Sequence, residues 1–429
     1  MKAGIWLIDK IRGTDILEKY RFLVNESGSA NKDFFVKESL AALLLAVKRN
    51  NPYYGKLLSQ TPDELIKADP LKVHSTLPLI DKQEINNHIT EFYKPYPGRK
   101  TQQKKTGGST GSPFYYYVDK EHLSWFWAYI YFYWNRHSGY QPGDPFITIA
   151  GNSLRTSKAA FTESIYHRLQ NNYFITGDII DKDISVDHRK VSEAVMLYGY
   201  PSSIINMLAV KPGFPSLAKK IKAIFTTSEQ LLPSVRSAIE EAFGLPVFDM
   251  YGANDGGILT CECSEHNGYH LNTRNCYAET FVNEFGMSEL LLTNLNSYGF
   301  PLIRYRVGDL GKLETEPCNC GLYSPRITEL KGRTRDVLKL KDGRTIHGSL
   351  FNKVFFHHTE IDGYKILQKE DHSITLFIHV KDKEKYQNLA IQVKNEITSL
   401  LQNVDIKIEP MLEMNPTNGK FKLIESHAI

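Results

Sequence analysis

From residue 146 onward, short apolar runs alternate with helical stretches, and this rhythm constrains the fold more than any other feature of the sequence. The runs at 146–150 (FITIA) and 223–227 (AIFTT) are short enough for strands, and 232–243 reads as a helix. This alternation is typical of α/β units. The sequence therefore predicts a layered α/β domain, in which 286–295 (GMSELLLTNL) adds further strand content before residue 330.

The expected secondary structure differs before and after this α/β region. The first ninety residues read as helices, with apolar periodicity at 40–47 (LAALLLAV) and a boundary at Asn51-Pro52. After residue 335, strands and helices become short. A chain of 429 residues exceeds what one hydrophobic core usually supports. We therefore expect two domains with a boundary near 332–336, a large one at 1–332 and a small one at 333–429.

Composition excludes several classes of protein. Apolar residues make up 41% of the chain and charged residues 23%, the balance of a globular protein. The formal charge of +4 is small, and no long basic run demands a nucleic acid or an anionic membrane. The first ten residues are too short an apolar stretch for a signal peptide, so we expect a cytoplasmic protein. The aromatic stretch 125–134 (WFWAYIYFYW) is half the length of a membrane span and predicts a buried helix.

A loop rich in Gly, Ser and Thr at 104–113 (KKTGGSTGSP) is the first candidate site. Glycines let backbone N–H groups converge on an anion, and the hydroxyl side chains donate further hydrogen bonds. The loop is not a Walker A motif, because no Gly-Lys-Ser/Thr ends it. Taken alone it also fits a flexible surface loop, so its interpretation as a phosphate loop depends on motifs further along the chain.

Five further segments come after this loop in a fixed order, and with it they resemble the signatures of the adenylate-forming superfamily. These segments are 227–231 (TSEQL), 251–255 (YGAND), 304–309 (RYRVGD), 332–336 (GRTRD) and 418–420 (NGK). Within the superfamily, the short length together with 51–54 (NPYY) and 301–305 (PLIRY) is similar to the phenylacetate-CoA ligase group. That group includes CapK-like relatives placed in capsular polysaccharide biosynthesis and others placed in coenzyme F390 biosynthesis.

The resemblance implies a fold and an activity. The fold is the adenylate-forming enzyme fold, with a large multi-layer α/β N-terminal domain and a small mobile α+β C-terminal domain. The activity is that of an AMP-forming acid:thiol ligase, which uses ATP and Mg²⁺ to convert a small carboxylic acid to an acyl-adenylate and then passes the acyl group to CoA. Two alternatives stay open, an adenylating ligase whose acceptor is an amine or hydroxyl, and a catalytically silent nucleotide-binding protein. The expected partners are a small-molecule carboxylate, ATP and CoA. We expect neither nucleic-acid binding nor insertion into a membrane. The protein could form a homodimer.

The chemistry of adenylation sets what the site must contain. A carboxylate approaches the α-phosphate of ATP while pyrophosphate leaves, so positive charge and N–H donors are needed. The resemblance assigns Lys420 to the α-phosphate, Asp255 to Mg²⁺, Asp309 to the ribose hydroxyls and Arg335 to the hinge. It assigns ATP or AMP binding to Thr106, Gly107, Gly108, Ser109, Thr110, Gly111, Ser228, Glu229, Tyr251, Gly252, Asn254, Asp309 and Arg333.

Three positions depart from the family pattern. Asp255 is one methylene shorter than the usual Glu, Asn254 replaces a Thr, and Ser112 stands where many members have Lys. These departures motivate the silent-protein alternative, whereas the retained Asp309, Arg333 and Lys420 argue against it. The resemblance also places the acyl pocket along 248–257, where Gly256 and Gly257 are expected to leave space or backbone access near the substrate.

The cysteines suggest a second, structural site. Four of the five cysteines form two Cys-x-Cys pairs, at 261–263 and 318–320, and His266 and His270 follow the first pair. Thiolates and imidazole suit tetrahedral Zn²⁺, and a complete protein ligand set leaves no open position for catalysis. We predict Cys263, His266, Cys318 and Cys320 as a structural zinc site, with Cys261 as the substitute ligand. The alternative is a set of buried free thiols.

Overall fold

The computed structural model describes the chain except for residues 1, 27–31, 106–113, 151–159, 177–184, 254, 284–285, 331, 334–336, 342–344, 348–350, 352–353, 356–357, 359, 381, 402–403, 405, 412–423 and 428–429. By its internal contacts the chain divides into two units, each assembled from several stretches. Unit 1 consists of 1–144, 164–171 and 248–330. Unit 2 consists of 145–163, 172–247 and 331–429.

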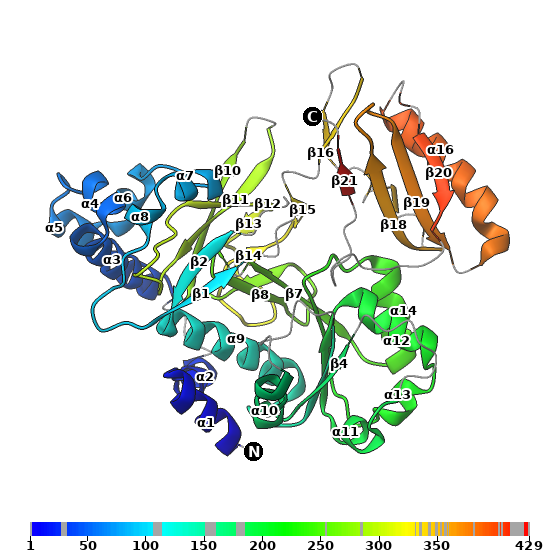
Figure 1. Ribbon diagram of the computed structural model, residues 1–429, viewed down its shortest axis with the longest axis horizontal. Helices are drawn as coiled ribbons and strands as arrows, with labels where there is room; N and C mark the ends of the chain where they lie inside the picture. The colour runs from blue at the N-terminus through cyan, green and yellow to red at the C-terminus, as the bar shows by residue number, and fades with distance from the viewer. Residues whose placement is uncertain are drawn as a thin grey trace. The chain divides into compact units, whose positions relative to one another are not determined.

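The predicted helical lead-in of unit 1 is confirmed (Figure 1). Its longest member buries Leu40, Leu44 and Val47 almost completely, as the apolar spacing of 40–47 requires. The predicted boundary at Asn51-Pro52 is also confirmed, because the Asn51 side chain accepts a 3.1 Å hydrogen bond from the backbone N–H of Tyr54 and caps the next helix. The helices are α1 (Lys2–Arg12), α2 (Ile16–Glu26), α3 (Lys32–Asn50), α4 (Pro52–Leu57), α5 (Asp63–Ala68), α6 (Pro70–Thr76), α7 (Lys82–Asn87) and α8 (Ile89–Phe92).

An antiparallel hairpin of β1 (Thr101–Lys105) and β2 (Tyr115–Asp119) leads into the aromatic helix α9 (Lys120–Ser138). Its aromatic stretch is helical and largely buried, as predicted. α9 ends at Gly139, whose φ of 71° is the left-handed conformation that favours glycine at a helix end. Among the described residues, no helix is both long and apolar enough to cross a membrane.

The strands of unit 1 form two antiparallel groups. One has the order β10 (Cys276–Val282), β11 (Ser288–Asn294) and β12 (Tyr305–Leu310). The other has the order β13 (Leu313–Glu314), β14 (Arg326–Ile327), β9 (Tyr269–Leu271), β8 (Ile258–Glu262) and β7 (Val247–Ala253). A bridge joins the start of α7 to β12, since the backbone N–H of Arg306 donates to the carbonyl of Ile80 at 2.8 Å.

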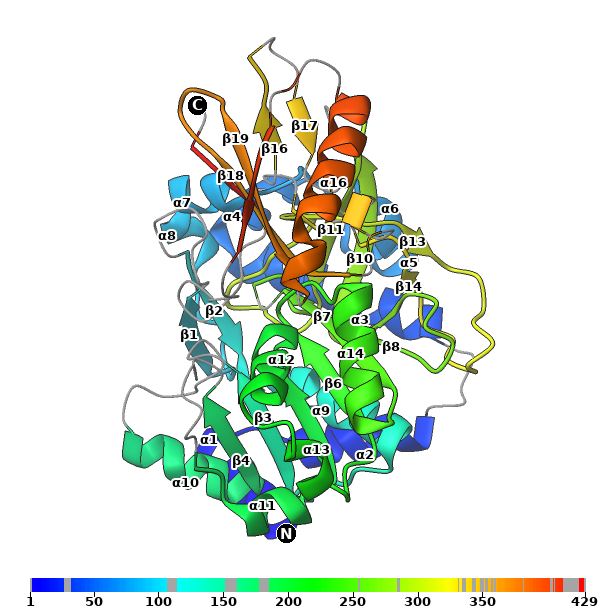
Figure 2. The ribbon, with the colours of Figure 1, turned by 90° about the vertical axis from the view of Figure 1, so that its right-hand side faces the viewer.

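Unit 2 contains the parallel strands that the alternating pattern predicted. Their order is β6 (Ile224–Thr227), β5 (Met196–Gly199), β3 (Phe146–Ala150) and β4 (Asn172–Thr176). Figure 2 shows the green helices α12 (Pro201–Val210), α13 (Phe214–Leu217) and α14 (Pro233–Phe243) beside this sheet, and α11 (His188–Glu193) lies near its end. The predicted strands at 146–150 and 223–227 and the predicted helix at 232–243 are confirmed. The helix α10 (Ala160–Gln170) connects β3 to β4.

The last stretch of unit 2 has its own small sheets. β16 (Val337–Lys339) pairs with β17 (Thr345–His347), and a four-stranded sheet has the order β20 (Ile406–Pro410), β19 (Ile374–Val380), β18 (Ile361–Gln368) and β21 (Ile424–Ser426). The short strand β15 (Gly332–Arg333) precedes them, the 3₁₀ turn η2 (Lys383–Lys385) follows β19, and the helix α16 (Tyr386–Leu401) packs against β20.

The division by contacts differs from the predicted domains 1–332 and 333–429. The last stretch of unit 2 begins at Lys331, close to the predicted boundary, but it groups with 145–163 and 172–247. Leu232 packs against the core of the C-terminal sheet, and the Ser234 hydroxyl donates to the carbonyl of Ile361 at 3.1 Å. These contacts explain why 331–429 is grouped with 145–163 and 172–247. The mobility of the C-terminal domain stays a prediction.

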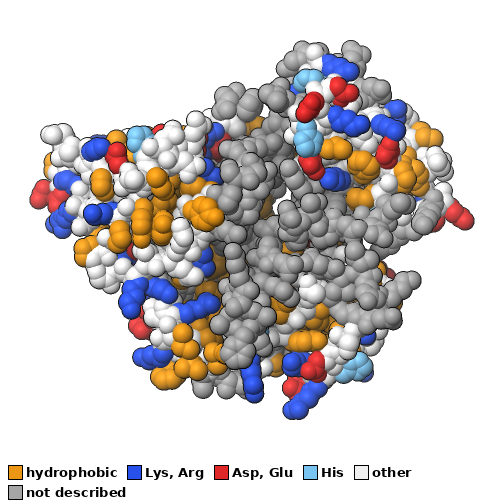
Figure 3. All heavy atoms as spheres, in the orientation of Figure 1, with side chains coloured by type: hydrophobic (Ala, Val, Ile, Leu, Met, Phe, Trp, Pro, Cys, Tyr) orange, Lys and Arg blue, Asp and Glu red, His pale blue; other side chains and the backbone are white. Residues whose placement is uncertain are grey.

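Charged side chains of both signs are mixed on the face of the molecule that Figure 3 shows. On the face that Figure 3 shows, basic and acidic side chains of the described residues are interspersed with apolar ones. This distribution agrees with the small net charge of +4.

Candidate nucleotide and metal sites

Several predicted site residues lie outside the described part of the chain. Of Arg333 the structure describes only the backbone, in β15. The residues outside it are Thr106, Gly107, Gly108, Ser109, Thr110, Gly111, Ser112, Asn254, Arg335 and Lys420. The phosphate loop, the catalytic lysine and the hinge residue therefore remain predictions from sequence.

Two of the motifs meet directly in unit 1. The phenol of Tyr251, on β7, donates a 2.6 Å hydrogen bond to Oδ2 of Asp309, on β12. Thr260 fixes the backbone of Tyr251 from the neighbouring strand β8, because its hydroxyl donates to the Tyr251 carbonyl at 2.9 Å. Gly252 lies opposite Leu259 in the same strand pair. The carboxylate of Asp309 is thus held in place, as an acceptor for ribose hydroxyls must be.

The segment of unit 2 that is predicted to contact adenine has a structural partner that sequence did not predict. Ser228 follows β6 with a φ of 69°, a left-handed conformation that is uncommon for a residue other than glycine. The Glu229 carboxylate accepts from the backbone N–H of Ser202 at 3.1 Å and from its hydroxyl at 2.9 Å. Ser202 lies in the first turn of α12. Glu229 therefore caps this helix with a negative charge, which the helix N-terminus favours.

Asp255, the predicted magnesium ligand, is buried and has two polar partners among the described residues. The phenol of Tyr305 donates to its Oδ2 at 2.9 Å, and the ammonium of Lys82 lies 3.2 Å from the same oxygen. Burial and then the charge of Asp255 hold the pKa of Tyr305 well above its ordinary value. The same two causes raise the pKa of Tyr116. Both phenol groups therefore stay protonated, and Tyr305 is the one that donates a hydrogen bond to this carboxylate.

The surroundings of Asp255 limit what metal it could hold. Among the described residues it does not belong to any group of three or more Asp, Glu, His or Cys ligands. A Mg²⁺ at Asp255 would thus take most of its oxygen ligands from nucleotide phosphates and water, which is how Mg²⁺ usually binds in nucleotide sites. A single carboxylate fits this role. Lys82 was not predicted, and its position in the polar segment 81–88 gave no signal beyond its charge.

The glycines of the predicted acyl pocket are closely packed. A Cβ on Gly256 would lie 2.4 Å from Cδ1 of Leu292. A Cβ on Gly257, whose φ is 74°, would lie 2.8 Å from the ring of His122 and 2.9 Å from the side chain of Asn294. The expectation of free space beyond these glycines is therefore corrected, because side chains of α9 and β11 already occupy it, whereas backbone access to a substrate stays a prediction.

The two cysteine pairs come together with one histidine. Within the described residues, one group of potential metal ligands forms, and the ligand atoms of its four members all lie within 4.8 Å of one another. Cys263 Sγ lies 3.7 Å from Cys318 Sγ, and Cys320 Sγ lies 3.3 Å from Nε2 of His270. The four residues are Cys263, His270, Cys318 and Cys320.

The predicted ligand His266 is replaced by His270. His266 lies in the turn after β8 with a φ of 46°, its Nδ1 is 3.2 Å from a Glu262 oxygen, and its ring stacks 5.4 Å from that of Phe248. His270 instead lies on β9, where it is paired directly opposite Cys261 of β8. Cys261, the predicted substitute, is buried but is not one of the four. The chain reverses between β8 and β9, so the later histidine lies beside the thiols.

Ser324 orients the ring of His270. The Nδ1 atom of His270 lies 3.0 Å from the hydroxyl and 3.2 Å from the carbonyl of Ser324, and the backbone N–H of Leu322 donates to Cys320 Sγ at 3.4 Å. A partner on Nδ1 leaves Nε2 to face the thiols, which is the usual arrangement around a metal-ligating histidine. The donor set therefore fits a closed tetrahedral Zn²⁺ site.

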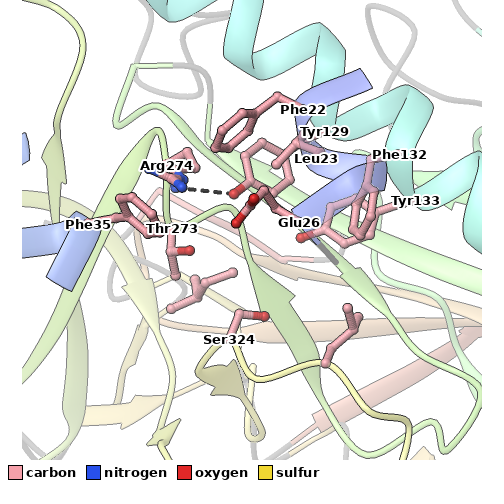
Figure 4. A pocket seen from close by; sticks show the side chains of 12 residues that line it. Phe22, Leu23, Glu26, Phe35, Tyr129, Phe132, Tyr133, Thr273, Arg274 and Ser324 are labelled. Atoms are coloured by element: carbon pink, nitrogen blue, oxygen red, sulfur yellow. Dashed lines mark hydrogen bonds between the residues drawn. The ribbon is translucent and has the colours of Figure 1, made fainter. Parts of the chain in front are cut away.

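A shallow hollow adjoins this cluster (Figure 4). Two of its lining residues hold His270, since Ser324 contacts the ring and the phenol of Tyr133 donates to the His270 carbonyl at 2.9 Å. At the other side the Arg274 guanidinium lies over the ring of Phe35 at 3.3 Å. The lining residues are Phe22, Leu23, Glu26, Phe35, Tyr129, Phe132, Tyr133, Leu271, Thr273, Arg274, Leu322 and Ser324.

The fold is that of the adenylate-forming ligases. The 2-hydroxyisobutyryl-CoA ligase in its postadenylation state, in complex with R3-HIB-AMP, superposes with a TM-score of 0.67 at 16% identity, covering 91% of this chain and 88% of that one. The anthranilate CoA ligase AuaEII in complex with anthranoyl-AMP gives a TM-score of 0.51 at 15% identity over 74% of this chain and 65% of the other. At these identities the likeness establishes the fold, and the predicted fold class is confirmed.

Sequence comparison then points to particular relatives. The chain is 23% identical to Protein CapK of Staphylococcus aureus over 361 residues, 82% of this chain and 79% of that protein. It is 28% identical to the phenylacetate-coenzyme A ligase of Thermus thermophilus over 124 residues, 27% of this chain and 28% of the relative. No family model matches the chain. The resemblance to the adenylate-forming superfamily and its phenylacetate-CoA ligase group, predicted from the motifs, is confirmed.

Proposed function

We propose that the protein uses ATP and a divalent metal to activate a small carboxylic acid as an acyl-adenylate, and then transfers the acyl group to CoA. The observation that carries this proposal is the 2.6 Å hydrogen bond between Tyr251 and Asp309, which joins two of the six ordered motifs in one place. The adenylate-forming fold, and the complexes of its structural neighbours with R3-HIB-AMP and anthranoyl-AMP, support it. The chain is therefore best regarded as an AMP-forming acid:thiol ligase.

In this proposal each described residue has a limited task. Asp309, oriented by Tyr251, accepts hydrogen bonds from the ribose hydroxyls and fixes the nucleotide. Asp255 offers one hard oxygen ligand to Mg²⁺, which would neutralise phosphate charge when bound. An oxygen of the acid attacks the α-phosphorus, the bond to the β-phosphate oxygen breaks, and pyrophosphate leaves. Lys420 is assigned to the α-phosphate from sequence alone, because an ammonium there stabilises the developing charge.

A second candidate differs in the acceptor. The likeness to Protein CapK extends over 79% of that protein, more than the likeness to the phenylacetate-coenzyme A ligase does. Because the CapK-like relatives are placed in capsular polysaccharide biosynthesis, this likeness supports, as the second candidate, an adenylating ligase that transfers the acyl group to an amine or a hydroxyl. The two candidates share the first half-reaction and separate only at the second.

We also propose that Cys263, His270, Cys318 and Cys320 hold a structural Zn²⁺. The support is their mutual proximity within 4.8 Å and the contact of Ser324 with His270. We further propose that 333–429 is a small C-terminal domain that moves about Arg335 between the two half-reactions, and that the protein acts in the cytoplasm.

The deciding experiment is pyrophosphate release from ATP and Mg²⁺ with a panel of aryl, aliphatic, hydroxy and amino acids, each with and without CoA. Release that requires one acid supports acyl-adenylate formation, and acyl-CoA in the product identifies CoA as the acceptor. Acid-dependent release that CoA does not alter favours the amine or hydroxyl acceptor. No release with any acid, from folded protein, would overturn the proposed ligase and favour a silent nucleotide-binding protein. The Lys420→Ala variant should lose adenylation while ATP binding is largely kept.

A further inference from the structure

We propose that Lys82 is a positioning residue that supplies the counter-charge of Asp255 and thereby sets how strongly this carboxylate binds a divalent cation. The inference rests on the proposed function, because that function places a metal at Asp255. It adds a residue that lies outside all six motifs and more than 20 positions before the nearest of them.

The position of Lys82 is fixed by the backbone of unit 1. Ile80 forms a bridge with β12, where its carbonyl accepts from Arg306 at 2.8 Å and its N–H donates to the Arg304 carbonyl at 3.3 Å. Asp81 then caps α7, and its side chain accepts from the backbone N–H of Glu84 at 2.9 Å. Lys82 is the first residue of α7, so the bridge and the cap together hold it beside the start of β12.

Tyr305 and Lys82 converge on a single atom. The Tyr305 phenol lies 2.9 Å and the Lys82 ammonium 3.2 Å from Oδ2 of Asp255. Within the described part of the chain, Oδ1 has no hydrogen-bond or ionic partner, so it is the oxygen on which a cation can bind. The Asp255 side chain is 8% exposed, and a buried carboxylate without a counter-charge is costly. Lys82 removes that cost when no metal is present.

The same ammonium opposes a cation at this carboxylate. Among the described residues, Lys82 is the cationic side chain that contacts Asp255. A positive charge this close repels an incoming dication and weakens its binding. The Lys82 side chain is 35% exposed and has a flexible stem, so the ammonium can move away as the dication arrives. It also lies 5.5 Å from the ring of Phe114, the first described residue after the Gly-rich loop.

The test measures Mn²⁺ binding rather than turnover. The probe is Mn²⁺ with ATP whose α,β-bridging oxygen is replaced by a methylene group, so that pyrophosphate cannot leave, and free Mn²⁺ is followed by electron paramagnetic resonance. We expect Lys82→Met to lower the Kd for Mn²⁺ on the order of tenfold, because one repelling charge near a partly exposed site is removed. Lys82→Arg keeps the charge and should stay within about threefold of the parent protein.

Lys56→Met is the matched control, because Lys56 forms an ion pair of 2.8 Å with Glu91 at the surface and is 72% exposed. It should leave the Kd unchanged. A Lys82→Met protein that is folded by circular dichroism and binds Mn²⁺ equally or more weakly would overturn the inference. If that variant does not fold, Lys82→Gln replaces it under the same criterion.

Asp255→Asn separates this inference from the proposed function. It should weaken Mn²⁺ binding strongly whether or not Lys82 is present. If it has no effect, the metal is not at Asp255 and the inference about Lys82 fails, whereas acid-dependent pyrophosphate release by the parent protein is judged independently.

Discussion

Tyr251 and Asp309 are 58 positions apart in the chain, and their side chains are joined by a 2.6 Å hydrogen bond between two strands of unit 1. The phenol occupies one lone pair of the carboxylate and fixes the direction of the others. A hydrogen bond to a charged group contributes roughly 1.5–3 kcal/mol. The relationship therefore has a measurable consequence for nucleotide binding.

Tyr251→Phe should weaken ATP binding about tenfold or more, because the hydrogen bond that orients Asp309 is lost. Isothermal titration with ATP and no acid present measures this directly. Tyr323→Phe, at a tyrosine that is 49% exposed, is the control and should keep the parental Kd. Equal affinity of the Tyr251→Phe and parent proteins would contradict the role given to this pair.

Glu229→Ala should destabilise the protein by about 1–3 kcal/mol, since two hydrogen bonds to Ser202 at the start of α12 are lost. Ser202→Ala removes only the hydroxyl bond and should cost about 1 kcal/mol. Denaturant unfolding of both variants measures the free energies. If Glu229→Ala unfolds at the same denaturant concentration as the parent, the capping role is wrong.

The metal cluster makes opposite predictions for the two histidines. His270→Ala should lose bound zinc, measured by elemental analysis, because a fourth ligand beside the thiols is removed. His266→Ala is the matched variant and should retain about one zinc per chain. Prolonged chelation should lower the melting temperature of the parent protein, since a structural metal contributes to folding. The reverse result for the two variants would restore His266 as the ligand.

Stability should fall as the pH is lowered from about 6.5 to about 4, in part through His122. Burial lowers the pKa of His122 from 6.5 to about 4, and its hydrogen bond to Asn294 offsets only part of this. The unfolded chain therefore binds the proton first, and stability falls by about 1.4 kcal/mol per pH unit for this group across the interval. His122→Gln should flatten the pH dependence of the unfolding free energy, whereas His188→Gln, at an exposed histidine, should not.

Sequence pattern predicted the elements of the fold well. The strands at 146–150 and 223–227 and the helix at 232–243 could be predicted because each is a local consequence of apolar spacing. The grouping of the C-terminal stretch with part of the α/β region could not. It depends on contacts such as Leu232 with the C-terminal core and Ser234 with Ile361, which join residues more than a hundred positions apart.

In the candidate sites, too, the features set by local sequence could be predicted and those set by long-range contacts could not. Cysteine spacing was enough to predict that thiols of the two pairs lie together, and Cys263, Cys318 and Cys320 are in the cluster. The choice between His266 and His270 depended on where the chain reverses, which the spacing does not encode. Lys82 could not be predicted either, because the bridge from Ile80 to β12 brings it to Asp255.

The close packing of Gly256 and Gly257 has a consequence for attempts to alter the proposed acid specificity by substitution. Because Leu292, His122 and Asn294 already occupy the volume beyond these two positions, a substitution library there should yield mostly poorly expressed protein. If the predicted acyl pocket lies along 248–257, we expect new acid specificity to be selected more readily from other residues of that segment, or by shortening His122 or Leu292 at the same time. A single larger residue at either glycine would thus require a neighbouring side chain to move, so change at these positions is expected to need a compensating substitution.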